Sequence, residues 1–429
     1  MADFDAIVVG SGCAGPIAAY ELAKAGKSVL VIERGNYAGA KNMTGGRLYA
    51  HSLKEVFPDF EKDAPLEREI THERISMLAP DANFTVDFTS DLMQREGSNS
   101  YSVLRGPFDQ WLAMQAEDAG AEYIYGIAVE RLLKDDAGKV IGVSAGEDEI
   151  TADVVILCDG VNSLLIDQAV GFRRPAASAM AVGIKQVIEV PDSQIEDRLL
   201  CGKGKGAAWL FVGDATHGSI GGGFMYANKS SISLGLVATI STLAESPTPI
   251  YQMLEDFKGH PAVAPLIEGG KVVEHSGHMV PEGGLDMMPE LVGDGVMLAG
   301  ESAMMCVNLG YMVRGMDYAI AAGMHAGRCA AKALDAGDTS KAGLGGYVAA
   351  LESGFVLQDL SQFRRFPHFM EETTRLFNEY PAMIRDIMNE MFVVDGSPVK
   401  PLKKSIMPIV KRVGFGAIFK DARKGMKAL

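Results

Sequence analysis

The stretch Gly10-Ser11-Gly12-Cys13-Ala14-Gly15 decides the fold, because it fits the GxGxxG pattern of a dinucleotide-binding loop. It follows a short apolar run, residues 4–9, that predicts a buried strand, and it opens a run of helix-forming residues that ends at Gly26. The next apolar run, residues 28–32, predicts a second strand and is followed by Glu33. Because strand, loop, helix, second strand and terminal acid agree, the sequence predicts a βαβ nucleotide-binding unit rather than a merely glycine-rich turn.

The three glycines of this loop have separate physical roles. Gly10 allows a tight turn, Gly12 lets the backbone approach a pyrophosphate, and Gly15 permits close packing of helix on strand. The helix N-terminus attracts the negative charge of the phosphates. The carboxylate of Glu33 can accept hydrogen bonds from both ribose hydroxyls and would repel a 2′-phosphate. No second unit of this kind occurs in the sequence, so we expect one bound dinucleotide.

The composition is typical of a globular protein. The chain has 429 residues, 48% apolar and 22% charged, and its net charge of −15 argues against general binding to nucleic acid. The five cysteines show no CxxC spacing of a zinc or iron–sulfur site, and their odd, scattered number predicts a reducing compartment. The sequence has no run of 18 apolar residues and no signal peptide, so we expect a cytoplasmic protein.

Two further predicted strands are each followed by a pair that consists of a glycine and an acidic residue. The apolar run 154–158 leads into Asp159-Gly160, and the run 295–299 leads into Gly300-Glu301. In a doubly wound sheet, ligands bind at the carboxyl ends of the strands. These pairs are therefore predicted to lie beside the dinucleotide, together with a helix that starts near Gly315.

Several stretches, spread over almost the whole chain, carry a resemblance to a known family. The sequence resembles the electron-transfer-flavoprotein:quinone oxidoreductase family, in its short bacterial FixC-type branch. That family lies in the superfamily of FAD-dependent monooxygenases and reductases that includes p-hydroxybenzoate hydroxylase and geranylgeranyl reductase. Beside GxGxxG, Glu33, Arg105-x-x-Phe108-Asp109, Asp159-Gly160 and Gly300-Glu301, the stretches that carry the resemblance are residues 39–49, 102–105, 292–295, 305–310 and 314–317.

The resemblance implies an extended FAD and assigns site residues by matching position. The amides around Cys13 to Gly15 would hold the pyrophosphate, Glu33 the adenosine ribose, and the backbone at Val129 the adenine. Thr44 and Gly45 would approach the isoalloxazine ring, Arg105 the phosphate or ribityl region, and Glu301 the ribityl hydroxyls, with the amides of Gly315 and Met316 at the pyrimidine edge. The predicted cofactor-binding residues are Gly10, Gly12, Cys13, Ala14, Gly15, Glu33, Arg34, Thr44, Gly45, Arg105, Val129, Asp159, Gly160, Gly300, Glu301, Gly315 and Met316.

Two features depart from the family pattern. The family normally has aspartate where this chain has Glu301, so the ribityl contacts are expected to shift by about one methylene. Long members of the family bind an iron–sulfur cluster through four cysteines near the C-terminus, whereas the last hundred residues here contain none. The resemblance to FixC-type proteins implies that a separate small ferredoxin-like subunit supplies the cluster. No catalytic side chain and no metal ligand is predicted, because the flavin carries the chemistry.

The expected fold is α/β: a doubly wound, Rossmann-like FAD-binding domain with an inserted antiparallel-sheet domain and a helical C-terminal region. The FAD-binding domain is predicted to be discontinuous, and the inserted sheet is expected to form one wall of a substrate or quinone pocket. The predicted divisions are residues 1–80, 101–173 and 286–340 for the FAD-binding domain, 81–100 and 174–285 for the sheet domain, and 341–429 for the helical region.

The end of the chain is strongly basic. Residues 400–429 contain nine Lys or Arg against Asp421, a net charge of +8 that leaves −23 on the preceding 399 residues. Apolar residues from Leu402 to Val413 fall on one helical face, which Pro408 interrupts. Three interpretations stay open: a helix on an anionic bilayer, a helix packed on the body with a solvated basic face, or a docking site for an acidic ferredoxin-like partner.

The resemblance implies an enzyme that passes electrons from a two-subunit electron-transfer flavoprotein to a quinone. The lack of a second nucleotide-binding unit favours a protein donor over NADH. An alternative is a flavin-dependent reductase or hydroxylase of a hydrophobic small molecule such as a prenyl chain. A third hypothesis is a structural subunit with little or no flavin, for which Glu301 is the only support.

Overall fold

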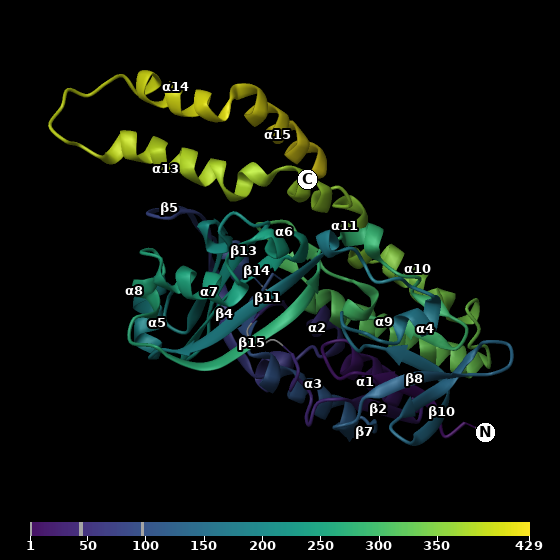
Figure 1. Cartoon of the computed structure of the whole chain (residues 1–429). Helices are drawn as coiled ribbons and strands as arrows, with labels where there is room; N and C mark the ends of the chain where they lie inside the picture. The colour runs from purple at the N-terminus through teal and green to yellow at the C-terminus, as the bar shows by residue number, and fades with distance from the viewer. Residues whose placement is uncertain (1, 43–45, 96–97) are drawn as a thin grey trace.

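The computed structural model describes residues 2–42, 46–95 and 98–429, and it consists of two large sheets flanked by helices, with a C-terminal helical region beyond them (Figure 1). The purple and blue N-terminal segments and the teal middle of the chain lie side by side, and the yellow C-terminal helices project from the body. This arrangement confirms the predicted α/β fold, a Rossmann-like sheet followed by an antiparallel sheet and a helical C-terminal region.

The first sheet is the predicted nucleotide-binding sheet. At its centre, β1 pairs in parallel with both β2 and β10, and β10 pairs in parallel with β17. Its central residues Ala6, Ile7 and Val8 are fully buried, as expected of a strand covered on both faces. Within the described residues this sheet comprises β1 (Phe4–Val9), β2 (Val29–Glu33), β7 (Glu122–Tyr125), β8 (Val129–Lys134), β9 (Val140–Ala145), β10 (Asp148–Leu157), β16 (Val292–Gly293) and β17 (Val296–Leu298).

The second sheet is mainly antiparallel and forms the other half of the molecule. Its order is β15-β11-β14-β13-β12-β4-β6-β3, with β5 paired to β4, and β12 and β4 run parallel. Its strands are β3 (Gly46–Tyr49), β4 (Leu66–Ala79), β5 (Ala82–Thr89), β6 (Ser100–Val103), β11 (Met180–Glu189), β12 (Lys205–Gly213), β13 (Gly221–Ala227), β14 (Ser231–Thr239) and β15 (Lys271–Pro281). A short ribbon pairs β18 (Val307–Asn308) with β19 (Val313–Arg314).

Helices cover the first sheet and one side of the second sheet, and they make up the C-terminal region. The long α9 packs on α1 and α2 of the first half, and α5 and α7 pack on the second sheet. The helices are α1 (Gly15–Lys24), α2 (His51–Val56), α3 (Arg105–Asp118), α4 (Ile166–Val170), α5 (Asp192–Leu199), α6 (Ile240–Glu245), α7 (Ile250–Gly259), α8 (Ala264–Ile267), α9 (Met316–Ala336), α10 (Gly346–Ser353), α11 (Phe355–Gln362), α12 (Phe366–Glu372), α13 (Glu379–Phe392), α14 (Leu402–Val413) and α15 (Phe415–Ala428).

The contact between α1 and α9 is made by backbone on backbone. A Cβ placed on Gly323 of α9 would lie 2.2 Å from the carbonyl oxygen of Ala14, and one on Gly327 would lie 2.6 Å from that of Ala18. Since these glycines are four residues apart, they share one face of α9. This face brings the helix into direct contact with the GxGxxG loop and fixes the position of the α9 N-terminus relative to it.

The C-terminal region ends in a helical hairpin. Helices α13 and α14 run side by side in opposite directions and extend away from the body (Figure 1). The helix α14 continues through Pro408, contrary to the interruption that the sequence predicts. Both Pro408 and Lys404, four residues earlier, are exposed, so water can hydrate the carbonyl that the missing N–H leaves unbonded.

Strands β3, β4 and β6 belong to the second sheet, although they lie in segments that we assign by sequence to the FAD-binding domain. Pairing within the second sheet does not by itself assign these strands to the sheet domain, because they also adjoin the loops of the first half. The division of the chain into residues 1–80, 101–173 and 286–340, residues 81–100 and 174–285, and residues 341–429 therefore stays a proposal.

We predict that Gly323→Ala destabilises the protein by roughly 1–3 kcal/mol, because the new methyl group would overlap the backbone of Ala14. The measurement is the free energy of unfolding in urea. The control is Gly345→Ala, where a Cβ meets nothing within 4 Å and φ is −60°. Equal stabilities of the two variants would contradict the close packing of α9 on the loop.

Candidate functional site

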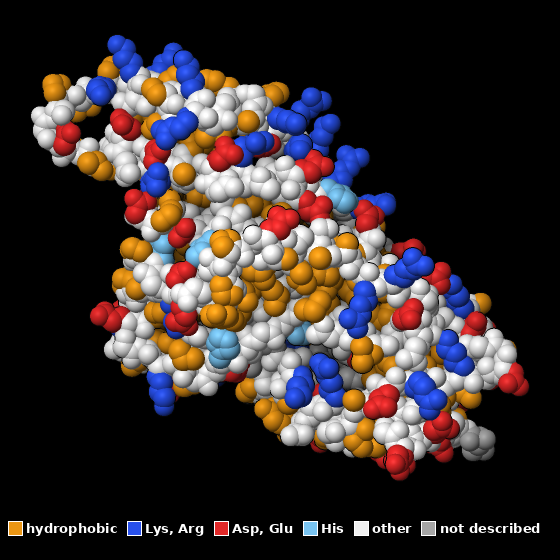
Figure 2. All heavy atoms as spheres, in the orientation of Figure 1, with side chains coloured by type: hydrophobic (Ala, Val, Ile, Leu, Met, Phe, Trp, Pro, Cys, Tyr) orange, Lys and Arg blue, Asp and Glu red, His pale blue; other side chains and the backbone are white. Residues whose placement is uncertain are grey.

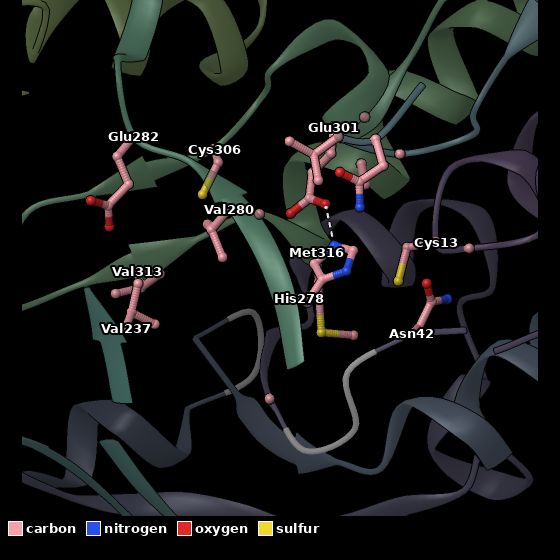
Figure 3. Close-up of a pocket in the computed structure, with 18 of the residues that line it drawn as sticks. Cys13, Asn42, Val237, His278, Val280, Glu282, Glu301, Cys306, Val313 and Met316 are labelled. Atoms are coloured by element: carbon pink, nitrogen blue, oxygen red, sulfur yellow. Dashed lines mark hydrogen bonds and ion pairs between the residues drawn. The ribbon is translucent and has the colours of Figure 1, made fainter. Parts of the chain in front are cut away.

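A cavity of about 430 Å³ lies between the two sheets, within the size range of small-molecule sites. Its walls come from the first sheet, the second sheet, α9 and the start of the C-terminal region. The predicted cofactor residues that line it are Gly10, Gly12, Cys13, Ala14, Glu33, Arg34, Arg105, Val129, Asp159, Gly160, Gly300, Glu301, Gly315 and Met316. Segments from across the chain thus converge on one site (Figure 3).

One predicted residue does not line the cavity, and two others cannot be placed. Gly15 lies behind the cavity wall, where a Cβ would come 1.9 Å from the carbonyl oxygen of Gly10. Its role is therefore the close packing that the motif predicts, and no contact with the cavity is seen. Thr44 and Gly45 lie outside the described residues, so their approach to the isoalloxazine ring stays a prediction.

The GxGxxG loop and Glu33 form the first end of the cavity. Gly10 has φ +98°, and a Cβ there would lie 2.4 Å from the carbonyl oxygen of Cys158, so this position requires glycine. The backbone N–H groups of Ser11 and Gly35 donate to the two carboxylate oxygens of Glu33 at 2.7 and 2.6 Å. These bonds fix the carboxylate at the cavity wall, where its remaining lone pairs can accept from ribose hydroxyls.

A buried carboxylate connects three cavity-lining side chains. Asp109 is fully buried and accepts two hydrogen bonds at 2.9 Å from the Arg105 guanidinium, in a bidentate pair. It also accepts from the Asn42 amide and, at 3.7 Å, from the Cys13 thiol. Burial raises the pKa of Cys13, so this thiol stays protonated and is a packing residue rather than a nucleophile.

Asp159 and Gly160 follow β10 and are held by the segment after β17. The Ser302 hydroxyl donates to the Asp159 carboxylate at 2.9 Å and accepts from the Gly160 N–H at 2.9 Å. Burial raises the pKa of Asp159 to about 6, while hydrogen bonds from Ser163 and Ser302 partly oppose the shift. The two strand ends that the sequence places together are thus joined by a direct hydrogen bond.

Glu301 reaches across the cavity to the second sheet. Its carboxylate oxygen lies 3.3 Å from Nε2 of His278 on β15, as the dashed line in Figure 3 marks. The extra methylene relative to aspartate makes this reach possible. The departure from the family pattern at this position therefore coincides with a contact between the two halves of the molecule.

The other end of the cavity is mainly apolar. Val237, Val280 and Val313 lie together in the close-up, away from Cys13 and Asn42 (Figure 3). Further apolar lining comes from Leu210, Phe211, Ile220, Phe224, Pro367 and Met370. This end of the cavity, which we call the apolar chamber, can hold a hydrophobic molecule against the cofactor end.

Several lining residues were not among those predicted. Asn42 lies inside a stretch that carries the family resemblance. So does Asp109, which does not line the cavity but holds Asn42 and Arg105, and an acid four residues after Arg105 is a spacing that could have identified this pair. His278 and Glu282 gave no such signal, because they come from β15 and the residue that follows it, far from any glycine motif. Only the pairing of β15 with β11 brings them to the cavity.

The residues present fit an extended FAD. Gly12 leaves the loop backbone without a side chain beside the Arg105 guanidinium and the Asn42 amide, each of which would lie 3.6 Å from a Cβ at this position. Ala14, directly before α1, and Gly315 and Met316, at the start of α9, line the cavity, so two helix N-termini adjoin it, which suits phosphate and anionic ring oxygens. Such a site on a doubly wound sheet defines a FAD-dependent oxidoreductase.

Comparison with known families supports this class, and comparison with solved structures supports the fold. The family described as FAD binding domain matches residues 3–200, and the ETF-QO/FixC family C-terminal domain matches residues 366–429. Among solved structures, a geranylgeranyl bacteriochlorophyll reductase-like protein from Thermoplasma acidophilum is 19% identical, with a TM-score of 0.71 over 98% of this chain and 99% of that one. The flavin-dependent brominase Bmp2 is 16% identical, with a TM-score of 0.63 over 98% and 99%.

Curated relatives identify the family of the chain. Protein FixC of Salmonella typhi is 49% identical over 426 residues, 99% of both chains. The probable electron transfer flavoprotein-quinone oxidoreductase YdiS of Escherichia coli K12 is 50% identical over 428 residues, again 99% of both chains. The chain therefore belongs to the FixC and electron transfer flavoprotein-quinone oxidoreductase family, and it is a FAD-dependent oxidoreductase.

We predict that Asp159→Asn raises the free energy of unfolding of the FAD-free protein at pH 7 by roughly 1–2 kcal/mol. This value is reduced to allow for the partial exposure of Asp159 to the cavity. The folded-state pKa, about 6, lies above the ordinary value of 3.8. The cost of burying the charged carboxylate is therefore fully present above pH 6 and disappears as the pH falls toward 4.

Urea unfolding between pH 4 and 7 measures this effect. The stability gain of Asp159→Asn should shrink as the pH is lowered. Asp153→Asn, at an exposed position of the same strand, is the control and should change stability by no more than about 0.5 kcal/mol. A gain for Asp159→Asn that is constant across this pH range would contradict the assignment.

Proposed function

We propose that this enzyme takes electrons from a two-subunit electron-transfer flavoprotein and delivers them to a quinone. The observation that carries the proposal is the apolar chamber, which is continuous with the predicted FAD site in one cavity. A quinone is a flat, largely apolar molecule with two polar oxygens. The chamber offers apolar walls with a small number of polar side chains, the lining typical of such ligands.

We assign the residues of the cofactor end as follows. The loop amides at Gly12 to Ala14 would hold the FAD pyrophosphate, and Glu33 the adenosine ribose. Arg105, fixed by Asp109, would face the phosphates or ribityl chain. When bound, FAD supplies the capacity to accept and donate electrons. The remaining residues proposed to contact it are Gly10, Arg34, Thr44, Gly45, Val129, Asp159, Gly160, Gly300, Glu301, Gly315 and Met316.

The electron donor is proposed to be a protein rather than NADH. Among the described residues, one βαβ unit with a GxGxxG loop is present, and the proposed FAD occupies it. The described part of the chain also contains no cluster of His, Cys, Asp or Glu suited to a metal ion. We therefore propose that a separate ferredoxin-like protein contributes iron–sulfur chemistry, as implied by the resemblance to FixC-type proteins.

The test is anaerobic reduction of the FAD-loaded enzyme, followed by flavin absorbance. We expect rapid reduction by the reduced electron-transfer flavoprotein of the same organism, slow reduction by NADH, and reoxidation by a short-chain quinone. Rapid reduction by NADH alone would overturn the proposed donor. Turnover of an isoprenoid alkene without any protein partner would instead favour the alternative, a reductase of a hydrophobic small molecule.

The C-terminal hairpin is proposed to bind an anionic membrane surface. The segment 392–402 at its tip is exposed throughout and includes Phe392, Val394 and Val399 at 73%, 82% and 91% exposure. Lys and Arg side chains line the upper edge of the hairpin (Figure 2). Exposed apolar residues next to basic ones are the pattern of a membrane-surface segment. No helix in the described part of the chain is long and apolar enough to cross a bilayer.

The alternatives for the basic end fit less well. Ile409 is buried, so part of the apolar face of α14 packs inside the protein, as one of the three interpretations expects. The apolar residues at the tip of the hairpin, however, do not pack on the protein and are free to contact another surface. The single acid, Asp421, is buried and bonded to Arg375 and Tyr380, so it does not neutralise the exposed basic charge. An acidic protein partner would not require the apolar tip.

We predict that Lys400→Glu/Lys403→Glu/Lys404→Glu lowers binding to vesicles containing anionic phosphatidylglycerol by at least about tenfold, since each basic residue contributes about 1 kcal/mol. Cosedimentation with vesicles measures the binding. Lys203→Glu/Lys229→Glu/Lys271→Glu, at exposed positions of the second half, is the control of equal charge. Equal losses in both variants, or no binding by the unmodified protein, would contradict a membrane role for the hairpin.

A further inference from the structure

One carboxyl group, Glu282, lies in the apolar chamber. It follows β15 directly and continues the alternation by which His278 and Val280 face the cavity, and all three line it. Figure 3 shows Glu282 beside Val280 and Cys306, on the side away from Cys13. A carboxyl group on an apolar wall is costly unless it is hydrogen-bonded or protonated, so its presence requires an explanation.

The surroundings of Glu282 hold its side chain in one orientation. The Asn308 amide donates to one carboxyl oxygen at 3.1 Å, and the Thr239 hydroxyl donates to the other at 3.3 Å. The Gly310 N–H donates to the Asn308 Oδ1 at 2.9 Å, which fixes the amide so that its NH₂ group faces Glu282. The two partners come from the end of β14 and from β18, and Gly310 lies in the loop before β19.

Among the described residues, no cationic side chain is paired with this carboxyl group. Across the residues that the structure describes, Glu282 forms no ion pair with Lys, Arg or His. Burial raises the pKa of Glu282, and the hydrogen bonds from Asn308 and Thr239 oppose that shift only in part. A fixed carboxyl group that can carry a proton in an apolar chamber is the arrangement of a general acid.

Resting on the proposed function, we propose that Glu282 is the proton donor to the quinone. A quinone needs two electrons and two protons to become a hydroquinone. When bound in its reduced, anionic form, which the N-terminus of α9 favours, FAD would supply both electrons and one proton. Glu282 supplies the second proton: its O–H bond breaks as an O–H bond forms on a quinone oxygen. A proton from bulk solvent then restores the carboxyl group.

Other titratable groups share the cavity wall and define the controls. Burial raises the pKa of the Cys306 thiol, which stays neutral beside Glu282. His278 is engaged with Glu301 toward the cofactor end. Glu371 and Arg47 also line the cavity, and neither bonds to Glu282. Glu371 is therefore a matched carboxylate, in the same cavity but outside the proposed proton path.

The test compares Glu282→Gln with Glu371→Gln in FAD-loaded, prereduced protein. Reoxidation is followed with a short-chain ubiquinone, which needs protons, and with a ferricenium salt, which accepts single electrons without them. We expect Glu282→Gln to slow reoxidation by the quinone roughly 100-fold, the usual size of general-acid catalysis. Reoxidation by ferricenium should be unchanged, and Glu371→Gln should behave as the unmodified protein. Glu282→Asp, which keeps the acid, should recover part of the quinone rate.

A second measurement does not depend on the loaded enzyme. An infrared pH titration of the FAD-free protein should show the C=O stretch of a protonated carboxylic acid that is lost in Glu282→Gln and kept in Glu371→Gln. Equal quinone rates for Glu282→Gln and the unmodified protein would overturn the inference. Failure of the unmodified, prereduced protein to react with any quinone, with ferricenium still active, would instead overturn the proposed function.

Discussion

The close packing of α9 on the GxGxxG loop is the constraint on which the rest of the structure depends. Gly323 and Gly327 place the helix backbone against Ala14 and Ala18 with no side chain between them. This contact sets where α9 begins, at Met316, and with it the position of the segment after β17 that carries Glu301. Residues three hundred positions apart thereby line one side of a single cavity.

The second sheet closes that cavity and gives it two different ends. At the cofactor end, the fully buried Asp109 holds Arg105 and Asn42 by hydrogen bonds, so the polar side chains are fixed before any ligand binds. At the other end, β14 and β15 supply Val237 and Val280, and the residue after β15 is Glu282. A flavin at one end and an electron acceptor at the other would then be close without a change in the fold.

Sequence patterns predicted the first sheet and the α/β class, because local rules govern them. Short-range glycine and apolar patterns also placed the strand ends at Asp159 and Gly300 side by side. The contacts of the cofactor-end residues with FAD stay predictions. The apolar chamber could not be predicted in this way, since Glu282 and His278 reach it only through the pairing of β15 with β11. The path of α14 through Pro408 depends on exposure, which the sequence does not reveal.

We propose that one cavity holds both the flavin and the quinone. A crystal structure of the FAD-loaded protein with a short-chain ubiquinone analogue tests this proposal. We expect the analogue ring among Val237, Val280 and Val313, with one carbonyl oxygen within hydrogen-bond distance of the Glu282 carboxyl group. An analogue bound elsewhere on the protein, with FAD in place and the chamber filled by ordered water, would contradict it.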